Sequence, residues 1–195
     1  MKKFQYNENT SKKMLLFLYI YYIRRGGVCM IRKANLNDVD GIMDIVNQIV
    51  VEMKESNNTQ WDENYPKAEN FKQDIEEGSL YVDEFEGDLI GFVCINDVQP
   101  DEYKEMNWIS DEDALVIHRM GINPKYRRQG KAKNLIRYAE NLAMDNGIMY
   151  LKTDTNSMNI KMYNLFKKCG FRFAGQMEFM GKPDVFYCYD IKLDV

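Results

Sequence analysis

One stretch in the second half of the chain places a strand, a short basic turn and a long helix in immediate succession. Residues 114–122 are apolar enough for a buried strand, and Pro124 follows its end. After a basic turn, Gly130 opens a helix predicted over 130–146, which carries an apolar stripe and stops at Gly147. A strand that leads directly into such a helix is typical of a sheet with helices packed on it.

The turn and the start of this helix have the chemistry of an anion site. The first turn of a helix offers backbone N–H groups without an intrahelical acceptor, and the positive end of the helix dipole. Gly130 lets the backbone approach a phosphate closely, and Ala132 keeps the entrance clear, while Arg127, Arg128 and Lys131 add positive charge. Two interpretations stay open here: a pyrophosphate site, or a basic loop that caps an ordinary helix. The stretch has neither the GK[ST] of a Walker loop nor the glycines of a dinucleotide fingerprint.

The charge of the chain argues against a general nucleic-acid binder. Its 26 basic and 30 acidic residues give a net charge of −4 at pH 7. Residues 1–29 hold six basic residues and one acidic residue, so the remainder holds 20 basic and 29 acidic residues, a net −9. Because phosphate backbones are bound by clustered Lys and Arg, a body this acidic leaves room only for a local anion site.

The cysteines and the single histidine predict no metal site. The cysteines lie far apart without a CxxC pair, and one histidine is too few for the usual zinc ligand sets. Scattered cysteines in a chain of this size are typical of the reducing cytoplasm, which is the predicted location. The four are Cys29, Cys94, Cys169 and Cys188.

The N-terminal segment differs from the rest of the chain. Residues 14–23 form an apolar run of ten, with two lysines before it and two arginines after it. A bilayer span needs about 20 residues, and a signal peptide would continue with small residues, so neither is predicted. Two alternatives stay open, a helix or strand packed on the domain or a partner, and a misplaced start codon with Met30 as the true start; a membrane-surface anchor is a third option. We predict one domain over 30–195 and an extension over 1–29.

The remaining pattern alternates short strands with amphipathic helices. Asn35, with an acid three residues later, predicts a helix start, and apolar residues at helical spacing carry that helix to about Lys54. An α/β fold is expected, with a mixed sheet and helices on both faces. The expected strands span 30–34, 80–85, 89–95, 114–122, 149–155, 171–179 and 185–193, the expected helices span 36–54, 66–75, 130–146 and 158–168, and 99–113 is expected to be a polar, acidic connection.

Several spaced motifs together resemble one family. Arg127-Arg-Gln-Gly-Lys-Ala132 resembles the R/Q-x-x-G-x-G/A acyl-CoA loop of the GNAT acetyltransferases, and Ile122-Asn-Pro-Lys-Tyr126 is similar to the strand end before that loop. About thirty residues later, Asn159 precedes the glycine of Cys169-Gly170-Phe171 by eleven residues, a spacing that is common in the family. The resemblance covers Met30 to about Leu193.

The resemblance implies a fold, an activity and a cofactor site. The fold is the acyl-CoA N-acyltransferase fold, whose mostly antiparallel mixed sheet splays like a V between strands 114–122 and 149–154. Acetyl-CoA would be the acyl donor, with its pantetheine arm in the split, where Asn159 would hydrogen-bond it, and its pyrophosphate on the amides of the loop. The residues implied to contact it are Met120, Gly121, Ile122, Arg127, Arg128, Gln129, Gly130, Lys131, Ala132, Lys133 and Asn159.

The chain departs from the family at the usual proton donor. Many members place a Tyr seven residues after the Asn, and this chain has Phe166 there, which has no hydroxyl. Tyr163, on the same predicted helix, is a candidate donor to the departing thiolate or else a packing residue. Asp154 is a candidate base or else a strand-end carboxylate, and His118 is a candidate base or else a structural histidine.

The resemblance implies an amine as the acceptor, and the acidic body favours a cationic one. A small molecule and a protein amine both satisfy this chemistry. A rival interpretation, motivated by Phe166, is an acyl-CoA-binding sensor domain with weak or no catalysis. A homodimer is compatible with the sequence, whereas nucleic-acid binding and stable membrane insertion are not expected. The aromatic residues expected to line the acceptor site are Trp61, Tyr65, Trp108, Tyr187 and Tyr189.

Overall fold

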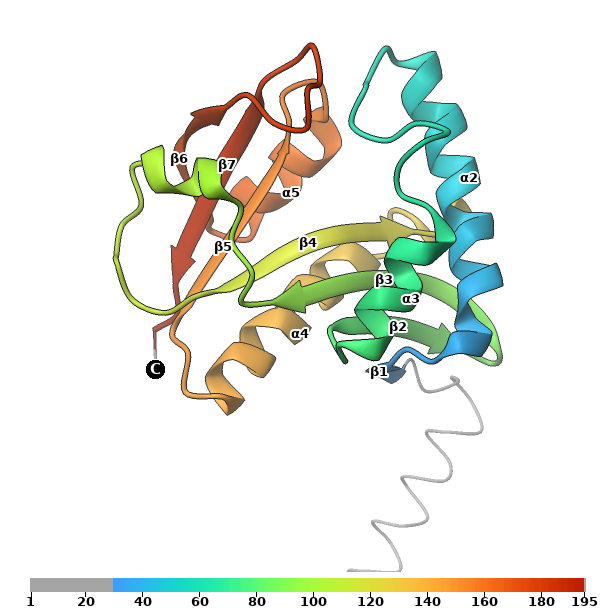
Figure 1. Cartoon of the computed structure of the whole chain (residues 1–195). Helices are drawn as coiled ribbons and strands as arrows, with labels where there is room; N and C mark the ends of the chain where they lie inside the picture. Colours follow the sequence, from blue (N-terminus) through green and yellow to red (C-terminus); the bar gives the residue numbers. More distant parts are fainter. Residues whose placement is uncertain (1–29, 195) are drawn as a thin grey trace, which may run out of the picture.

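The computed structural model describes residues 30–194, so the predictions made for 1–29 lie outside the described residues. Seven strands form one sheet in the order β1-β2-β3-β4-β5-β7-β6 (Figure 1). Neighbouring strands are antiparallel except β4 and β5, which are parallel, so the expected mixed and mostly antiparallel sheet is confirmed. The strands are β1 (Met30–Lys33), β2 (Leu80–Phe85), β3 (Asp88–Asn96), β4 (Leu115–Ile122), β5 (Tyr150–Asn156), β6 (Arg172–Met177) and β7 (Phe186–Lys192).

In the described part of the chain, four α-helices cover the two faces of the sheet, α2 and α3 on one face and α4 and α5 on the other (Figure 1). No helix within 30–194 is long and apolar enough to cross a membrane. The helices are α2 (Val39–Glu55), α3 (Ala68–Glu76), α4 (Lys131–Asp145) and α5 (Ile160–Lys168), joined by the short 3-10 turns η1 (Leu36–Asp38), η2 (Asp101–Glu105) and η3 (Pro124–Tyr126).

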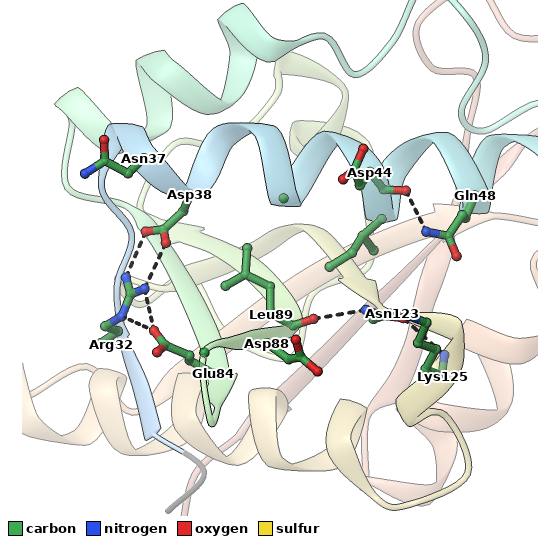
Figure 2. Close-up of a pocket in the computed structure, with 13 residues that line it drawn as sticks. Arg32, Asn37, Asp38, Asp44, Gln48, Glu84, Asp88, Leu89, Asn123 and Lys125 are labelled. Carbon is green, nitrogen blue, oxygen red and sulfur yellow. Dashed lines mark hydrogen bonds and ion pairs between the residues drawn. The ribbon is translucent and has the colours of Figure 1, made fainter.

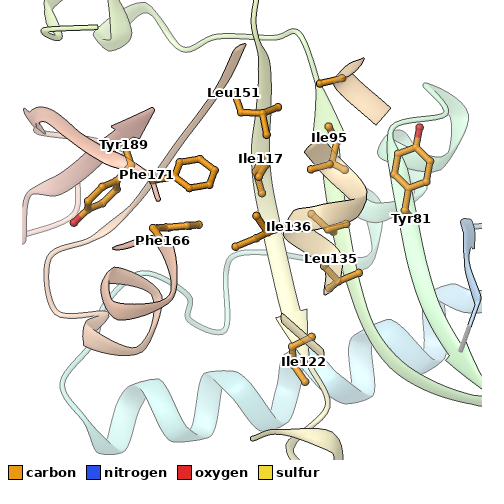
Figure 3. Close-up of a cluster of buried hydrophobic side chains, with 13 residues drawn as sticks. Tyr81, Ile95, Ile117, Ile122, Leu135, Ile136, Leu151, Phe166, Phe171 and Tyr189 are labelled. Carbon is orange, nitrogen blue, oxygen red and sulfur yellow. The ribbon is translucent and has the colours of Figure 1, made fainter. Parts of the chain in front are cut away.

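The apolar stripe of each helix explains which face it covers. On the first face, Ile42 and Val46 of α2 are buried with Phe92 of β3. On the second face, Leu135 of α4 lies in one cluster with Phe166 of α5, around residues of β4 and β5 (Figure 3). Burying such side chains is the main stabilising term in the fold, at about 1.5–3 kcal/mol each.

The start of α2 follows the predicted cap. The side chain of Asn35 accepts from the N–H of Asn37, and the carboxylate of Asp38 accepts from the N–H of Asn35 at 2.7 Å. The first turn is a 3-10 turn, so the α-helix itself begins at Val39. Asp38 is also held by Arg32 at 2.8 Å, which ties this cap to β1.

The polar connection 99–113 packs more tightly than its composition predicted. Tyr103 is only 2% exposed and lies in a third cluster with Val116 and Phe186. Asn107 donates its N–H to the Ala174 carbonyl at 3.0 Å, which ties the connection to β6. The connection therefore covers the β5-β7-β6 half of the sheet, on the same face as α2 and α3. Its two aromatic residues, not its many acids, decide where it lies.

The sheet opens between β4 and β5. The two strands pair only from Leu115 to Ile117, opposite Leu151 to Thr153. Directly afterwards the register between β4 and β3 shifts. Ile117 pairs with Ile95 and Met120 pairs with Val93, so β4 has one residue more than β3 between these two pairs. Such a bulge bends a strand. Beyond it β4 and β5 diverge, while β5 stays paired with β7 as far as Asn156, so the expected split is present (Figure 1).

Candidate functional site

The edge of β4 that faces the split carries backbone groups without a strand partner. Asn123 donates its N–H to the carbonyl of Ile90 at 2.8 Å, and Gly121 lies two residues earlier on the same ladder with β3. In an antiparallel ladder the residues in between turn their N–H and C=O groups the other way. The backbone groups of Met120 and Ile122 therefore face the split, where an extended chain could pair with them.

Gly121 has a packing role. A Cβ on this residue would lie 2.7 Å from Cζ of Phe92 and 3.0 Å from Cδ1 of Ile49 on α2. The glycine therefore allows α2 to approach β4 closely. The Cβ side of Gly121 faces α2, and the predicted contact of Gly121 with a cofactor stays a prediction.

The N-terminus of α4 is open. Gly130 is the N-cap of this helix with φ +77°, and no side chain caps the helix. A Cβ placed on Gly130 would have no neighbour within 4 Å. The first intrahelical bond is donated by Asn134, so the N–H groups of the first turn have no acceptor within the helix. Arg128 is held at φ +60°, a conformation that costs a non-glycine residue roughly 1 kcal/mol or more and that is frequent at functional sites. Arg128, Gln129 and Lys133 are exposed, and Lys131 and Ala132 are half-buried.

Arg127 is directed away from this helix start. Its guanidinium pairs with Glu52 of α2 at 2.7 Å and donates to the Ile122 carbonyl at 3.2 Å. Glu52 is also within 3.4 Å of Lys161 on α5, and these two cations keep its pKa below the usual value although burial raises it. In this structure the Arg127 guanidinium thus fixes the loop to α2, and its contact with a bound phosphate stays a prediction.

Asn159 lies at the head of the split as the N-cap of α5. Its Oδ1 accepts from the N–H of Met162 at 3.3 Å, and its Nδ2 donates to Oε1 of Gln60 at 2.8 Å. The same oxygen of Gln60 accepts from the hydroxyl of Thr155 at 3.0 Å. Sequence reasoning missed Gln60, because nothing local marks a glutamine in the α2–α3 loop as a neighbour of α5.

Asp154 is the first residue of β5 past the last pair with β4. It is half-buried, and its Oδ2 accepts a hydrogen bond from the hydroxyl of Tyr103 at 2.8 Å. Burial raises the pKa of Asp154 to about 6; the Tyr103 bond opposes this shift and the charge of Glu102 adds to it. Tyr103 was also missed by sequence reasoning; the only signal was an aromatic residue inside a polar stretch.

His118 is the first residue of β4 after Ile117, the last residue that pairs with β5, so it corresponds to Asp154 on the other strand. Its Nε2 is 2.8 Å from Oδ1 of Asn96, so the ring is held by the end of β3. Burial and the neighbouring Arg119 lower the pKa of His118 to about 4, so the ring is neutral at pH 7. This geometry fits the structural alternative for His118 better than the catalytic one.

Two aromatic residues of α5 differ in their surroundings. Phe166 is 1% exposed and packs on Phe171 and Tyr189, with ring centroids 5.5 Å from each (Figure 3). Tyr163 is half-buried, 6.4 Å from the ring of Tyr189. The hydroxyl of Tyr189 is buried and has no hydrogen-bond partner among residues 30–194. Phe166 is therefore a core residue, and Tyr163 is the more accessible ring on this helix.

The aromatic residues expected to line one acceptor site do not come together. Trp61 stacks on Phe92 in the cluster under α2, and Tyr65 accepts a bond from Arg119 at the edge of that cluster. Trp108 lies in the third cluster, and Tyr187 and Tyr189 lie on the α5 face. The sheet separates these side chains onto its two faces, so they do not form one continuous lining, and the contact of each with an acceptor stays a prediction.

Two cavities lie away from the split. One of about 480 Å³ lies between α2, the β2–β3 turn and η3, and is lined mainly by charged and amide side chains (Figure 2). Arg32 binds both Asp38 and Glu84 at its edge. The other, of about 360 Å³, lies between β1, β2 and α4. None of the predicted site residues lines either cavity.

Comparisons with known proteins agree with this geometry. The family model of the GNAT acetyltransferases matches residues 47–171. A solved structure from Staphylococcus aureus Mu50 is 30% identical with a TM-score of 0.67, covering 85% of this chain and 99% of that chain. A GNAT acetyltransferase from Streptococcus agalactiae is 24% identical with a TM-score of 0.75, covering 87% and 98%. The Salmonella typhimurium protein yncA, solved with acetyl-CoA, is 18% identical with a TM-score of 0.62, covering 85% and 94%. Among curated proteins, nothing matches significantly.

The split sheet with an open helix start beside it defines the class as an N-acyltransferase fold. Within that class, the match over residues 47–171 places the chain plainly: it belongs to the GNAT acetyltransferase family and is an N-acetyltransferase.

Proposed function

We propose that this protein transfers the acetyl group of acetyl-CoA to a primary amine. The observation that carries the proposal is the edge of β4 that has no strand partner beyond Ile117 and accepts only the Arg127 bond at the Ile122 carbonyl. This edge leads through a basic turn to a helix start without a side-chain cap. The edge of β4 suits an extended arm that carries amide groups, because such an arm can add to a strand edge. The start of α4 suits a pyrophosphate. The acetyl-CoA bound in the yncA structure supports this choice of donor.

The donor would be held mainly by backbone groups. Met120 and Ile122 would pair with the pantetheine arm, and the first-turn amides of α4 would bind the pyrophosphate. Gly130 fits this role because its open side leaves room for a phosphate against the backbone. Asn159 would donate to the arm in place of Gln60. Arg128 and Lys133, both exposed at the helix start, would add charge.

The chemistry needs a neutral amine and a proton for the departing sulfur. A primary ammonium has a pKa of about 10.4, so it must lose a proton before it attacks the thioester carbon. Asp154 would take that proton, since a carboxylate with a pKa of about 6 is a usable base near neutral pH. The C–S bond then breaks, and the second proton of the attacking nitrogen passes to sulfur through Tyr163 or solvent. The products are the N-acetyl amine, CoA thiol and one released proton.

A second candidate function is an acetyl-CoA sensor with weak or no turnover. The burial of Phe166 in the core favours it, because the family's usual hydroxyl position is filled by packing. Release of CoA thiol with a panel of small and peptide amines separates the two. Turnover supports the transferase, and tight binding of acetyl-CoA without turnover supports the sensor.

The donor site is tested by Gly130→Glu. A carboxylate there would face the phosphates, so calorimetry should show a loss of acetyl-CoA affinity of about a hundred-fold or more, given charge repulsion of a few kcal/mol. Gly147→Glu is the matched control: Gly147, with φ +73° and no neighbour within 4 Å, stands at the other end of the same helix. It bears the same backbone strain and should leave affinity unchanged. Equal affinity in both variants would contradict this placement of the donor.

A further inference from the structure

Asp154 stands where the sheet opens, and this inference rests on the proposed function. The last β4–β5 pair joins Ile117 to Thr153, and the hydroxyl of Thr153 donates to the Ile117 carbonyl at 2.8 Å. Asp154 is therefore the first residue of β5 that no longer has β4 beside it. A thioester at the apex of the split would lie next to this residue.

The two oxygens of the Asp154 carboxylate have different surroundings. Oδ2 accepts from the Tyr103 hydroxyl at 2.8 Å. Among residues 30–194 nothing donates to Oδ1, and this oxygen is not one of the buried side-chain atoms that lack a partner, so it keeps some exposure to solvent. One oxygen is therefore committed to Tyr103, and the other is left to take a proton.

Tyr103 is held so that its hydroxyl cannot easily turn elsewhere. Its carbonyl accepts from Nε1 of Trp108 at 2.6 Å, and the two rings lie 4.8 Å apart. Farther along the connection, the N–H of Ile109 donates to the carboxylate of Asp190 on β7 at 2.8 Å. The whole connection is thus anchored to the sheet. Since Tyr103 is only 2% exposed, its hydroxyl has little access to bulk water, and Asp154 is the partner that the structure gives it.

We propose that Tyr103 is a positioning residue, which holds Oδ2 of Asp154 so that Oδ1 faces the split and accepts the proton of the acceptor ammonium. Asp154 goes from carboxylate to carboxylic acid as the ammonium becomes an amine, and the proton leaves to water after transfer. A neutral hydrogen-bond donor also favours the ionised carboxylate over its acid. Tyr103 therefore sets both the orientation and the working pH of the base.

The charged and titratable groups around Asp154 come from three elements. From β4, His118 stands at the corresponding step and is neutral near pH 6, because its pKa is about 4. From η2, Tyr103 donates its hydrogen bond and Glu102 contributes a negative charge; from β7, the Cys188 thiol is close enough for the carboxylate to raise its pKa. Without the Tyr103 hydroxyl, only burial and Glu102 act on the carboxyl, and both raise its pKa. Because Asp154 must be ionised to accept a proton, kcat/KM falls as the pH drops through its pKa. Loss of the hydroxyl therefore moves this acid limb to higher pH.

The test is the pH profile of kcat/KM for Tyr103→Phe, which keeps the ring and removes the hydroxyl. We expect the acid limb of the unmodified enzyme near pH 6 and that of the variant about one pH unit higher. Tyr150→Phe is the matched control: the Tyr150 hydroxyl donates to the buried Asp190 at 2.6 Å, on the paired part of the same strand. That variant loses the same kind of bond and should keep its acid limb in place.

A second readout does not depend on turnover. The carboxyl carbon of Asp154, assigned through Asp154→Asn, should titrate by NMR at higher pH in Tyr103→Phe than in the unmodified protein. A carboxyl that titrates identically in both proteins, or an acid limb that does not move, overturns the proposal. Failure of the unmodified enzyme to acetylate any amine overturns the proposed function instead, and this is seen before any variant is measured.

Discussion

At the scale of single residues, two ionisable side chains stand directly past the last β4–β5 pair, His118 on β4 and Asp154 on β5. Burial shifts both toward their neutral forms, so the pKa of His118 falls to about 4 and that of Asp154 rises to about 6. At neutral pH the histidine carries no charge, and its Nε2 is engaged with Asn96. Asp154 is consequently the group that titrates nearest to the working range of a base.

The proton donor is a second question at this scale. If Tyr163 protonates the departing thiolate, Tyr163→Phe should lower kcat by about 10²-fold, the usual size of an acid–base contribution, with little change in acetyl-CoA affinity. Steady-state kinetics with calorimetry measure both. Tyr138→Phe on α4 is the control, because Tyr138 is also half-buried and its ring packs on Tyr81. Full activity in Tyr163→Phe would leave solvent as the donor.

Restoring the family's usual hydroxyl is not a neutral change in this chain. Phe166 is enclosed by Phe171 and Tyr189, so Phe166→Tyr would force a hydroxyl into a packed core. Insertion of extra atoms into such a core costs about 1–3 kcal/mol. In this chain the packing around position 166 therefore suits phenylalanine better than the tyrosine that is usual in the family.

At the scale of elements, the loop between α2 and α3 is bonded across the split. Gln60 binds both β5 and α5, Thr59 donates to Asp184 at 3.1 Å, and Lys182 pairs with Asp62 at 2.6 Å. All of these contacts join the α2–α3 loop to the half of the sheet beyond β4. The loop therefore links the two sides of the V beyond the point where β4 and β5 stop pairing.

Gln60→Ala should loosen this loop. The variant removes the acceptor for two donors, and a net loss of about 1 kcal/mol corresponds to roughly five-fold faster opening. Hydrogen exchange of the amides at 57–65 measures this directly. Gln73→Ala is the control, because Gln73 is exposed and its side chain donates to Glu77, the C-cap residue of the same helix. Unchanged exchange in Gln60→Ala would show that the other two links hold the loop by themselves.

At the scale of the whole molecule, every candidate residue lies between Gln60 and Tyr189, and the first strand of the described part of the chain starts at Met30. Deletion of 1–29 should therefore leave acetyl-CoA affinity unchanged within about two-fold, while solubility or oligomeric state can change. Calorimetry measures the first, and light scattering measures the second for the full chain and the deletion variant. Loss of donor binding on deletion would show that the segment belongs to the domain.

The sequence by itself determined the elements and their order. Asn35, the apolar spacing over 42–53 and Gly130 are local signals, and the helices they predict begin and end within a few residues of α2 and α4. Such signals succeed because hydrophobic periodicity and helix caps act over a few residues of the same chain. The resemblance of the loop at 127–132 to the family added the split, which no local pattern encodes.

Only the tertiary structure decided which side chains meet at the split. Tyr103 and Asp154 are 51 residues apart, and Gln60 and Asn159 are 99 apart, so neither contact has a local signature. The motif predicts a phosphate contact for Arg127, whereas in the structure its guanidinium pairs with Glu52, 75 residues away. These partners depend on how the sheet order and the bulge in β4 bring distant segments together, and that is a property of packing, not of sequence pattern.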